Sequence, residues 1–270
     1  MTQAEKGLAF RALHQREGAF IIPNPWDAGS AKILAHLGFE ALATTSMGAA
    51  YSFGRLDGQL SREQTFSNAA VIVEATTLPI SADLEDCFGD TAEAVAETIR
   101  LCSQTGIVGG SVEDSTGRPE DPIYEFEFAV ERVRAAVEAA RSLPFTFTLT
   151  ARAENFITGR PYLDDTIKRL QAFQDAGADV LFAPGIKTRE QIRAVLSSID
   201  RPLNVLMGMV GVDLDLAELS EMGVKRISVG GSLCRAAIGG FLKAAREMKD
   251  HGTFNYNAEA VPYKELTAML

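Results

Sequence analysis

The chain has 270 residues, a formal net charge of −10 and a pI near 4.9. This acidic balance argues against nucleic acid and anionic membrane as partners, since both select basic surfaces. Hydrophobic residues make up 46% and charged residues 23%, so the chain can bury a large core and is not of the disordered class. A closed α/β barrel uses about 250 residues, and we expect residues 1–270 to form one such domain with a short C-terminal extension.

The N-terminal residues and the cysteines indicate the cellular compartment in which the protein resides. Residues 1–20 mix acidic and basic side chains and contain no apolar run, so they do not resemble a signal peptide. No segment approaches the roughly 20 apolar residues of a membrane span. The three cysteines, Cys87, Cys102 and Cys234, lack metal-type spacing, and their odd number suits a reducing compartment. We therefore expect a cytoplasmic protein.

Along the whole chain, a short apolar run alternates with a polar turn and an amphipathic stretch. The runs that predict strands are Ala19–Pro23, Ala41–Ser46, Pro79–Glu85, Gly109–Glu113, Phe145–Arg152, Val180–Pro184, Leu203–Met207 and Arg226–Val229. The stretches that predict helices are Ala28–Leu37, Arg62–Ala75, Thr91–Thr105, Phe126–Ser142, Leu163–Ala176, Thr188–Ile199, Leu216–Met222 and Ser232–Lys249. Such alternation requires a parallel sheet. Eight units without an interposed domain favour a (β/α)8 TIM barrel over an open doubly wound sheet, for which the dinucleotide-binding G-x-G-x-x-G fingerprint is missing.

Acidic side chains gather where the predicted strands end, and this is the end of a barrel that carries the active site. Asp83 and Glu85 end the third predicted strand, and Glu113 ends the fourth. Because side chains alternate between the two faces of a strand, Asp83 and Glu85 are expected on the same face. Three carboxylates so close repel one another unless a cation neutralises them or one is protonated. No histidine ends a strand, and oxygen ligands alone favour Mg²⁺, with Mn²⁺ as an alternative.

Several polar residues of this region are open to both a structural and a functional interpretation. Asp86 and Asp90 are explained as well by helix caps or solvated loops. Arg152 ends the fifth strand, where its guanidinium would either pair with the acidic cluster or bind a carboxylate in a bidentate manner. Thr44 and Asn204 add polar groups to the ends of the second and seventh strands.

Four motifs follow one another along the chain in this order: ATTSMGAA, PISADLEDCFG, GSVEDS and TLTARAENF. Together they resemble the isocitrate lyase/phosphoenolpyruvate mutase superfamily, from about Phe20 to Gly240. The resemblance implies a (β/α)8 barrel whose eighth helix is exchanged between the subunits of a homodimer or homotetramer. It also implies an enzyme that binds Mg²⁺ and a small 2-oxo carboxylate or its enolate, and that makes or breaks C–C or C–P bonds.

The resemblance further implies roles for individual residues. Asp83 corresponds to the main metal-binding aspartate, Glu85 and Glu113 to further carboxylates of the metal site, and Asp57 to an outer one; most of them reach the metal through water. Arg152 corresponds to the arginine that contacts the substrate carboxylate. The residues expected to bind substrate are Thr44, Ser46, Met47, Gly48, Arg152 and Asn204. Those expected to take part in catalysis are Ser46, Glu113 and Arg152.

The loop after the fourth strand departs from the family pattern. It reads STGRPEDPIYEF, without the cysteine-containing K-[KR]-C-G-H loop of the lyases or the gating loop of the mutases and hydrolases. Arg118 in this loop is either a solvated cation or a contact to a second anionic group of the substrate. Met47 and Cys87 both stand where the family has glycine. Cys87 has no basic partner in sequence, which favours a structural role over that of a nucleophile.

The chain thus lacks an evident general acid or base, and this favours chemistry that needs an electron sink. We expect a Mg²⁺-dependent carbon–carbon lyase that cleaves or decarboxylates an oxaloacetate-like 2-oxo acid through an enolate. Two alternatives stay open. One is C–P chemistry on phosphonopyruvate, by a hydrolase or mutase, and the other is a barrel that binds a 2-oxo acid with little catalysis.

Overall fold

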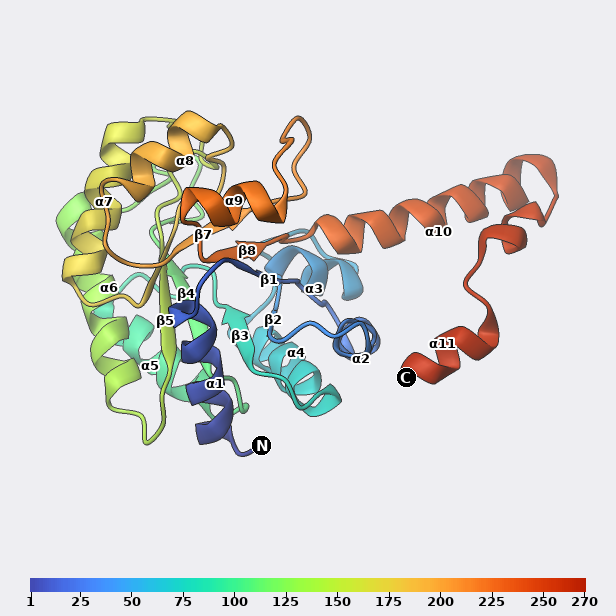
Figure 1. The fold of residues 1–270 in the computed structure, drawn as a ribbon, viewed down its shortest axis with the longest axis horizontal. Helices are drawn as coiled ribbons and strands as arrows, with labels where there is room; N and C mark the ends of the chain where they lie inside the picture. The colour runs from blue at the N-terminus through green and yellow to red at the C-terminus, as the bar shows by residue number, and fades with distance from the viewer.

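Eight parallel strands form a nearly closed barrel in the computed structural model, which describes residues 1–270 (Figure 1). The strands are β1 (Phe20–Ile22), β2 (Leu42–Ala43), β3 (Ile80–Asp83), β4 (Gly109–Glu113), β5 (Thr148–Arg152), β6 (Val180–Phe182), β7 (Leu203–Leu206) and β8 (Arg226–Ser228). Their order is β1-β8-β7-β6-β5-β4-β3-β2. Between the two ends of this sheet, Ala43 N donates a hydrogen bond of 3.1 Å to Pro23 O. The predicted (β/α)8 TIM barrel is confirmed.

The helices that follow the strands lie around the outside of the barrel, except the last of them, α10, which extends away from it (Figure 1). They are α2 (Ala28–His36), α4 (Arg62–Ala75), α5 (Ala92–Ser103), α6 (Phe126–Arg141), α7 (Leu163–Asp175), α8 (Arg189–Leu196), α9 (Leu216–Met222) and α10 (Ser232–His251). Four further helical segments were not predicted: α1 (Gln3–Gln15), α3 (Ser46–Ser52), the 3₁₀ segment η1 (Asn255–Glu259) and α11 (Tyr263–Met269).

Helix α1 covers the end of the barrel at which the strands begin. It starts with a capping box, in which Thr2 accepts a hydrogen bond from the Glu5 backbone and the Glu5 side chain accepts one from the Thr2 backbone. Phe10 is fully buried and packs with Phe20 and Val108. These apolar contacts cover part of the end at which the strands begin.

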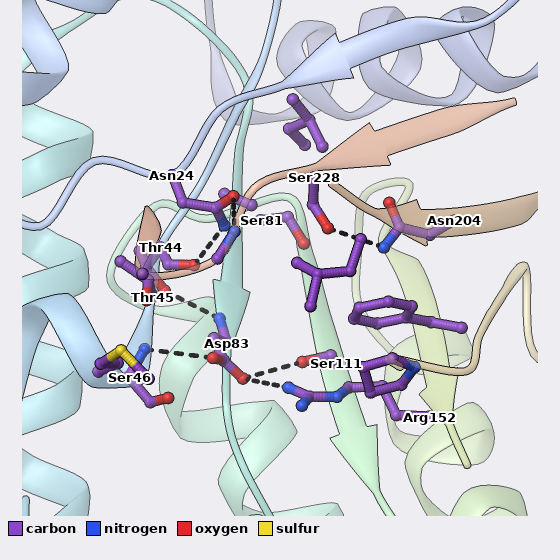
Figure 2. A pocket seen from close by; sticks show the side chains of 18 of the residues that line it. Asn24, Thr44, Thr45, Ser46, Ser81, Asp83, Ser111, Arg152, Asn204 and Ser228 are labelled. Atoms are coloured by element: carbon purple, nitrogen blue, oxygen red, sulfur yellow. Dashed lines mark hydrogen bonds and ion pairs between the residues drawn. The ribbon is translucent and has the colours of Figure 1, made fainter. Parts of the chain in front are cut away.

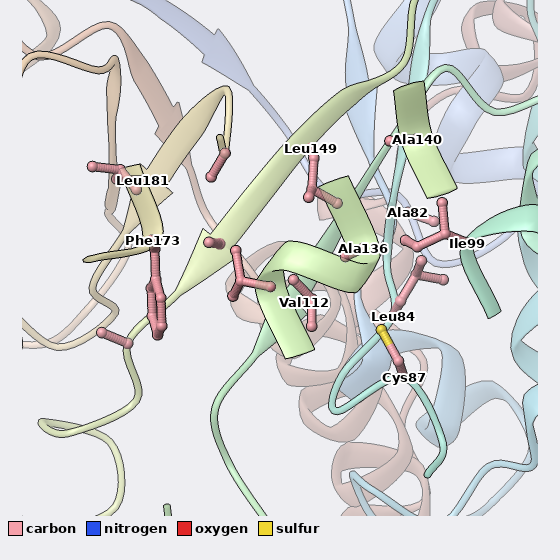
Figure 3. Packing of buried hydrophobic residues seen from close by; sticks show 14 of the residues in the cluster. Ala82, Leu84, Cys87, Ile99, Val112, Ala136, Ala140, Leu149, Phe173 and Leu181 are labelled. Carbon is pink, nitrogen blue, oxygen red and sulfur yellow. The ribbon is translucent and has the colours of Figure 1, made fainter. Parts of the chain in front are cut away.

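The main hydrophobic core fills the layer between the strands and the surrounding helices. Leu84, Ile99 and Val112 belong to this cluster, together with Ala136 of α6 and Phe173 of α7 (Figure 3). Barrel interiors are commonly filled by bulky branched side chains. Here the interior instead carries polar groups, because positions that face inward hold buried Ser81, Ser111, Asn204, Arg226 and Ser228.

Helix α10 projects away from the barrel, and the segment after it folds back so that α11 lies near α2 (Figure 1). Lys32 Nζ of α2 donates a hydrogen bond of 2.9 Å to Leu270 O. Apolar side chains of α10 are left in solvent, and Phe241 is 71% exposed. None of the helices has both the length and the apolar character that a membrane crossing requires.

Candidate active site

Two adjoining cavities open where the strands end. The inner cavity, of about 210 Å³, reaches into the barrel, and the outer cavity lies beside it under the loops after β3 and β4. Ser46, Asp57, Arg152 and Ile157 line both. The other polar residues of the inner cavity are Asn24, Thr44, Thr45, Ser81, Asp83, Ser111, Asn204, Arg226 and Ser228. Those of the outer cavity are Glu85, Asp86, Glu113, Ser115, Glu154 and Thr158.

Arg152 stands at the junction of the two cavities and pairs with three carboxylates. Its Nη1 lies 2.8 Å from Asp83 Oδ1, its Nη2 3.0 Å from Glu113 Oε2, and its Nε 2.9 Å from Glu154 Oε1. The register explains two of these contacts, because Glu113 and Arg152 are directly opposed on β4 and β5, and Asp83 lies on the next strand. Burial lowers the pKa of Arg152, but the charges of Glu113, Glu154 and Asp83 outweigh burial and raise this pKa well above its usual value.

The Asp83 carboxylate is fixed from several sides. Oδ1 accepts hydrogen bonds from Arg152 and from Ser111 Oγ, and Oδ2 accepts one of 3.2 Å from Ser46 N (Figure 2). The Asp83 backbone N–H donates to Thr44 Oγ1 at 2.8 Å. Asp83 therefore links the end of β2, the start of α3 and Arg152, and it holds these groups around the inner cavity.

Glu85 reaches the site by a turn and not by strand alternation, which corrects the sequence-based argument. Strand β3 ends at Asp83, and Glu85 lies in the left-handed region with φ +51°. Its side chain lines the outer cavity with Glu113 and Asp57. Burial and the charges of Asp83 and Asp57 raise the pKa of Glu85 to about 8, and burial raises that of Glu113 well above its usual value.

The carboxylates of Asp57, Asp83, Glu85 and Glu113 are neighbours, but they do not converge on a single position. No group of three histidine, cysteine, aspartate or glutamate side chains is close enough to hold a metal ion. Arg152 occupies the space between Asp83 and Glu113, and Asp57 stands near Ser46 at the cavity mouth. A set of three direct protein ligands for a metal is thus absent.

Of the residues expected to bind substrate, Gly48 is the one that lines neither cavity. Its N–H donates to Thr45 Oγ1, which caps α3. A Cβ at Gly48 would lie 2.7 Å from Thr45 Cγ2 and 2.8 Å from Trp26 Cβ. The glycine is therefore needed for packing. Met47 does line the inner cavity, where its side chain packs against Gly231.

Arg118 and Cys87 lie away from the site. Arg118 Nη1 is 3.2 Å from Asp90 Oδ1, and its guanidinium stacks over the Tyr124 ring. Neither cavity includes Arg118. Cys87 is fully buried in the core beside Leu84 and has φ +65°, which explains the glycine at this position of the family pattern (Figure 3). Burial raises the pKa of its thiol, which disfavours the nucleophilic thiolate.

The polar residues inside the barrel were missed as site residues. Ser81 and Ser228 stand two positions from Asp83 and Arg226 of the same cavity, and Ser111 stands two positions before Glu113 of the outer cavity. The period of two along a strand was therefore the available signal. Asn24 follows β1, and its Oδ1 accepts hydrogen bonds of 2.9 Å from the N–H groups of Val229 and Gly230. Only the closed barrel shows that these separate strands face one cavity.

Comparison with known proteins settles the family. The family model for phosphoenolpyruvate phosphomutase matches residues 10–249. The chain belongs to this family. The resemblance to the isocitrate lyase/phosphoenolpyruvate mutase superfamily is thereby confirmed.

Three relatives illustrate the range of the family. One is the solved structure of a lyase or mutase from Burkholderia cenocepacia J2315, which is 57% identical to this chain. Its TM-score is 0.96, and the match covers 98% of this chain and 95% of that one. The 2-methylisocitrate lyase of Escherichia coli K12 is 29% identical over 75% of this chain and 70% of its own. The oxaloacetate decarboxylase of Chromohalobacter salexigens is 27% identical over 92% and 87%. The expected class of enzyme, a carbon–carbon lyase, is the class of these two named relatives.

Proposed function

We propose that this chain is a Mg²⁺-dependent lyase that cleaves a C–C bond in a small, oxaloacetate-like 2-oxo carboxylate. The observation that carries the proposal is the Arg152 cluster, which joins one guanidinium to three carboxylates at the junction of the two cavities. An inner cavity of about 210 Å³ suits a small acid, since pockets for drug-sized ligands run from roughly 300 Å³ upward.

The outer cavity has the donor chemistry that Mg²⁺ requires. Its acidic residues Glu85, Glu113 and Asp57 offer oxygen ligands only. With a pKa of about 8, raised first by burial and then by the charges of Asp83 and Asp57, Glu85 retains a proton at pH 7 in the absence of a cation. A divalent cation would supply the positive charge that these carboxylates lack. The residues present therefore fit Mg²⁺, with Mn²⁺ as the alternative.

We assign the substrate contacts to the groups between the cavities. Arg152 would bind the carboxylate next to the 2-oxo group, with Ser46 and Thr44 beside it and Asn204 deeper in the inner cavity. Glu113 would act by holding Arg152 in place. A bound Mg²⁺ would polarise the 2-oxo group and stabilise the negative charge left when a bond at C3 breaks. The two named relatives, a decarboxylase and a 2-methylisocitrate lyase, support bond cleavage of this type.

Turnover of oxaloacetate tests this function. We expect the purified protein to accelerate product formation from oxaloacetate above the rate of Mg²⁺ alone, and EDTA to remove this activity. Pyruvate, oxalate and acetate are all quantified, so that cleavage of the C3–C4 bond and of the C2–C3 bond are both seen. Phosphonopyruvate is assayed in parallel. Turnover of phosphonopyruvate alone would favour C–P chemistry, and binding of 2-oxo acids without turnover of either compound would favour a binding protein.

We also propose that the chain is one cytoplasmic domain that assembles through α10 as a homodimer or homotetramer. The exposed Phe241 and Leu242 give this helix an apolar surface, and Gly239 and Gly240 permit the close approach of a second helix. Sedimentation at micromolar concentration is expected to show an oligomer. Phe241→Glu is expected to shift it toward the 29.1 kDa monomer, whereas Lys249→Glu near the end of the same helix serves as the control. A wild-type monomer would contradict this proposal.

A further inference from the structure

Arg226 is a buried cation without an acidic partner. It opens β8, lines the inner cavity and is only 5% exposed. Its Nε donates a hydrogen bond of 2.9 Å to Asn204 Oδ1, but Nη1 is buried with no hydrogen-bond partner, and no carboxylate lies within ion-pair distance. Arg169, which is buried to a similar degree, is compensated by Asp114, and the buried Arg132 donates to the backbone carbonyls of Asp86, Gly89 and Asp90. An uncompensated buried charge is costly, so it indicates that something outside the protein neutralises it.

The groups around Arg226 add no negative charge. Asn204 and Ser228 are neutral and bonded to each other, with Asn204 Nδ2 2.9 Å from Ser228 Oγ. His14 faces Arg226 from α1, and burial together with the charge of Arg226 lowers the pKa of His14 to about 3, so this histidine is neutral. Burial and the positive charge of Arg152 lower the pKa of Arg226 to about 9, which still leaves it charged at pH 7.

The inner cavity therefore has a cation at each end. Asn204 and Ser228, the neighbours of Arg226, lie across the cavity from Asp83, Arg152 and Ser46 (Figure 2). Arg152 pairs with three carboxylates, whereas Arg226 pairs with none and its Nη1 has no hydrogen-bond partner. Guanidinium donors of this kind match a carboxylate in a bidentate manner.

We propose that Arg226, with Asn204 and Ser228, forms a second anion subsite inside the barrel that binds the distal carboxylate of a dicarboxylate substrate. This inference rests on the proposed function for the position of the first carboxylate, at Arg152 and Ser46. The substrate then lies along the barrel axis, with its 2-oxo acid end outward. Arg226, and not the surface residue Arg118, selects for the second negative charge.

The subsite also restricts the reaction. An ion pair with Arg226 stabilises a carboxylate and not the neutral CO₂ that leaves in a decarboxylation. The subsite therefore favours a reaction that keeps the distal carboxylate over one that releases it as CO₂.

Binding of matched ligand pairs tests the subsite without any turnover. The pairs are malate with 2-hydroxybutyrate, and 2-oxoglutarate with 2-oxovalerate, whose members differ in the distal carboxylate. Calorimetry with Mg²⁺ present is expected to show the dicarboxylate of at least one pair bound about tenfold or more tightly by the wild type. Arg226→Met is expected to remove this preference and to leave the monocarboxylate within about twofold of wild type.

Two further variants keep the test decisive. Arg226→Lys, which retains the charge, is expected to recover part of the preference and also serves if Arg226→Met does not fold. Arg118→Met is the control and is expected to leave the preference unchanged. The subsite is wrong if the wild type shows no preference, if Arg226→Met weakens both members of a pair equally or neither, or if Arg118→Met removes the preference. Because only binding is measured, failure of the proposed catalysis gives a different result from failure of this subsite.

Discussion

Asp83→Asn is expected to lower kcat/KM with Mg²⁺ on the order of 1000-fold, the loss found when a group that stabilises transition-state charge is removed. The substitution keeps the size of the side chain but removes the charge that would attract the metal and that pairs with Arg152 at 2.8 Å. The fold should persist, because Asp83 lies at the rim of the barrel and not in the apolar core. The effect on catalysis is measured as activity at increasing Mg²⁺ concentration. The Tm of each protein shows whether the fold persists.

Asp90→Asn is the matched control for this change. Asp90 is exposed, pairs with Arg118 and accepts a hydrogen bond from the Tyr124 hydroxyl, outside both cavities. We expect activity within about twofold of wild type, since exposed ion pairs contribute little. Full activity of Asp83→Asn, or an equal loss in both variants, would remove Asp83 from the metal site.

The periodic pattern of the sequence predicted the repeating part of the fold well because local signals mark its elements. Helices α4 and α9 begin and end at the predicted residues, and each starts with a capping box, formed by Ser61 with Gln64 and by Asp215 with Glu218. Helix α1 was missed although Thr2 and Glu5 form the same box. Its buried side chains face the end of the barrel at which the strands begin, so its role depends on a surface that only the closed ring creates.

The site was predictable where the residues follow one another in a motif, and less so where the fold brings them together. Asp83, Glu113 and Arg152 end adjoining strands and meet as expected. Glu85 required a left-handed turn that strand alternation does not describe. Arg226 looked like an ordinary first residue of a strand, since its burial without an acidic partner depends on side chains from β7 and α1.

Arg152→Lys is expected to raise KM for a 2-oxo acid about tenfold or more, because a lysine cannot bind a carboxylate with two parallel hydrogen bonds. The same change also removes structural contacts. One ammonium group cannot pair with Asp83, Glu113 and Glu154 together, and the side chain of Arg152 is only 15% exposed. Breaking buried ion pairs costs about 3–5 kcal/mol when one partner is lost, so a lower Tm is expected as well.

The two effects of Arg152→Lys are separable, and their separation decides which role the arginine has. If Arg152 binds the substrate carboxylate, KM rises in the folded variant below its Tm, and the affinity for monocarboxylate 2-oxo acids falls with it. If Arg152 only holds the acidic residues apart, Tm falls while KM and these affinities stay near wild type. Arg141→Lys is the control for the loss of a guanidinium, since Arg141 pairs with Asp179 at 2.7 Å far from the inner cavity. Arg152→Lys is expected to weaken the binding of ligands without a distal carboxylate as well. This result is therefore distinct from the loss of dicarboxylate preference that is expected for Arg226→Met.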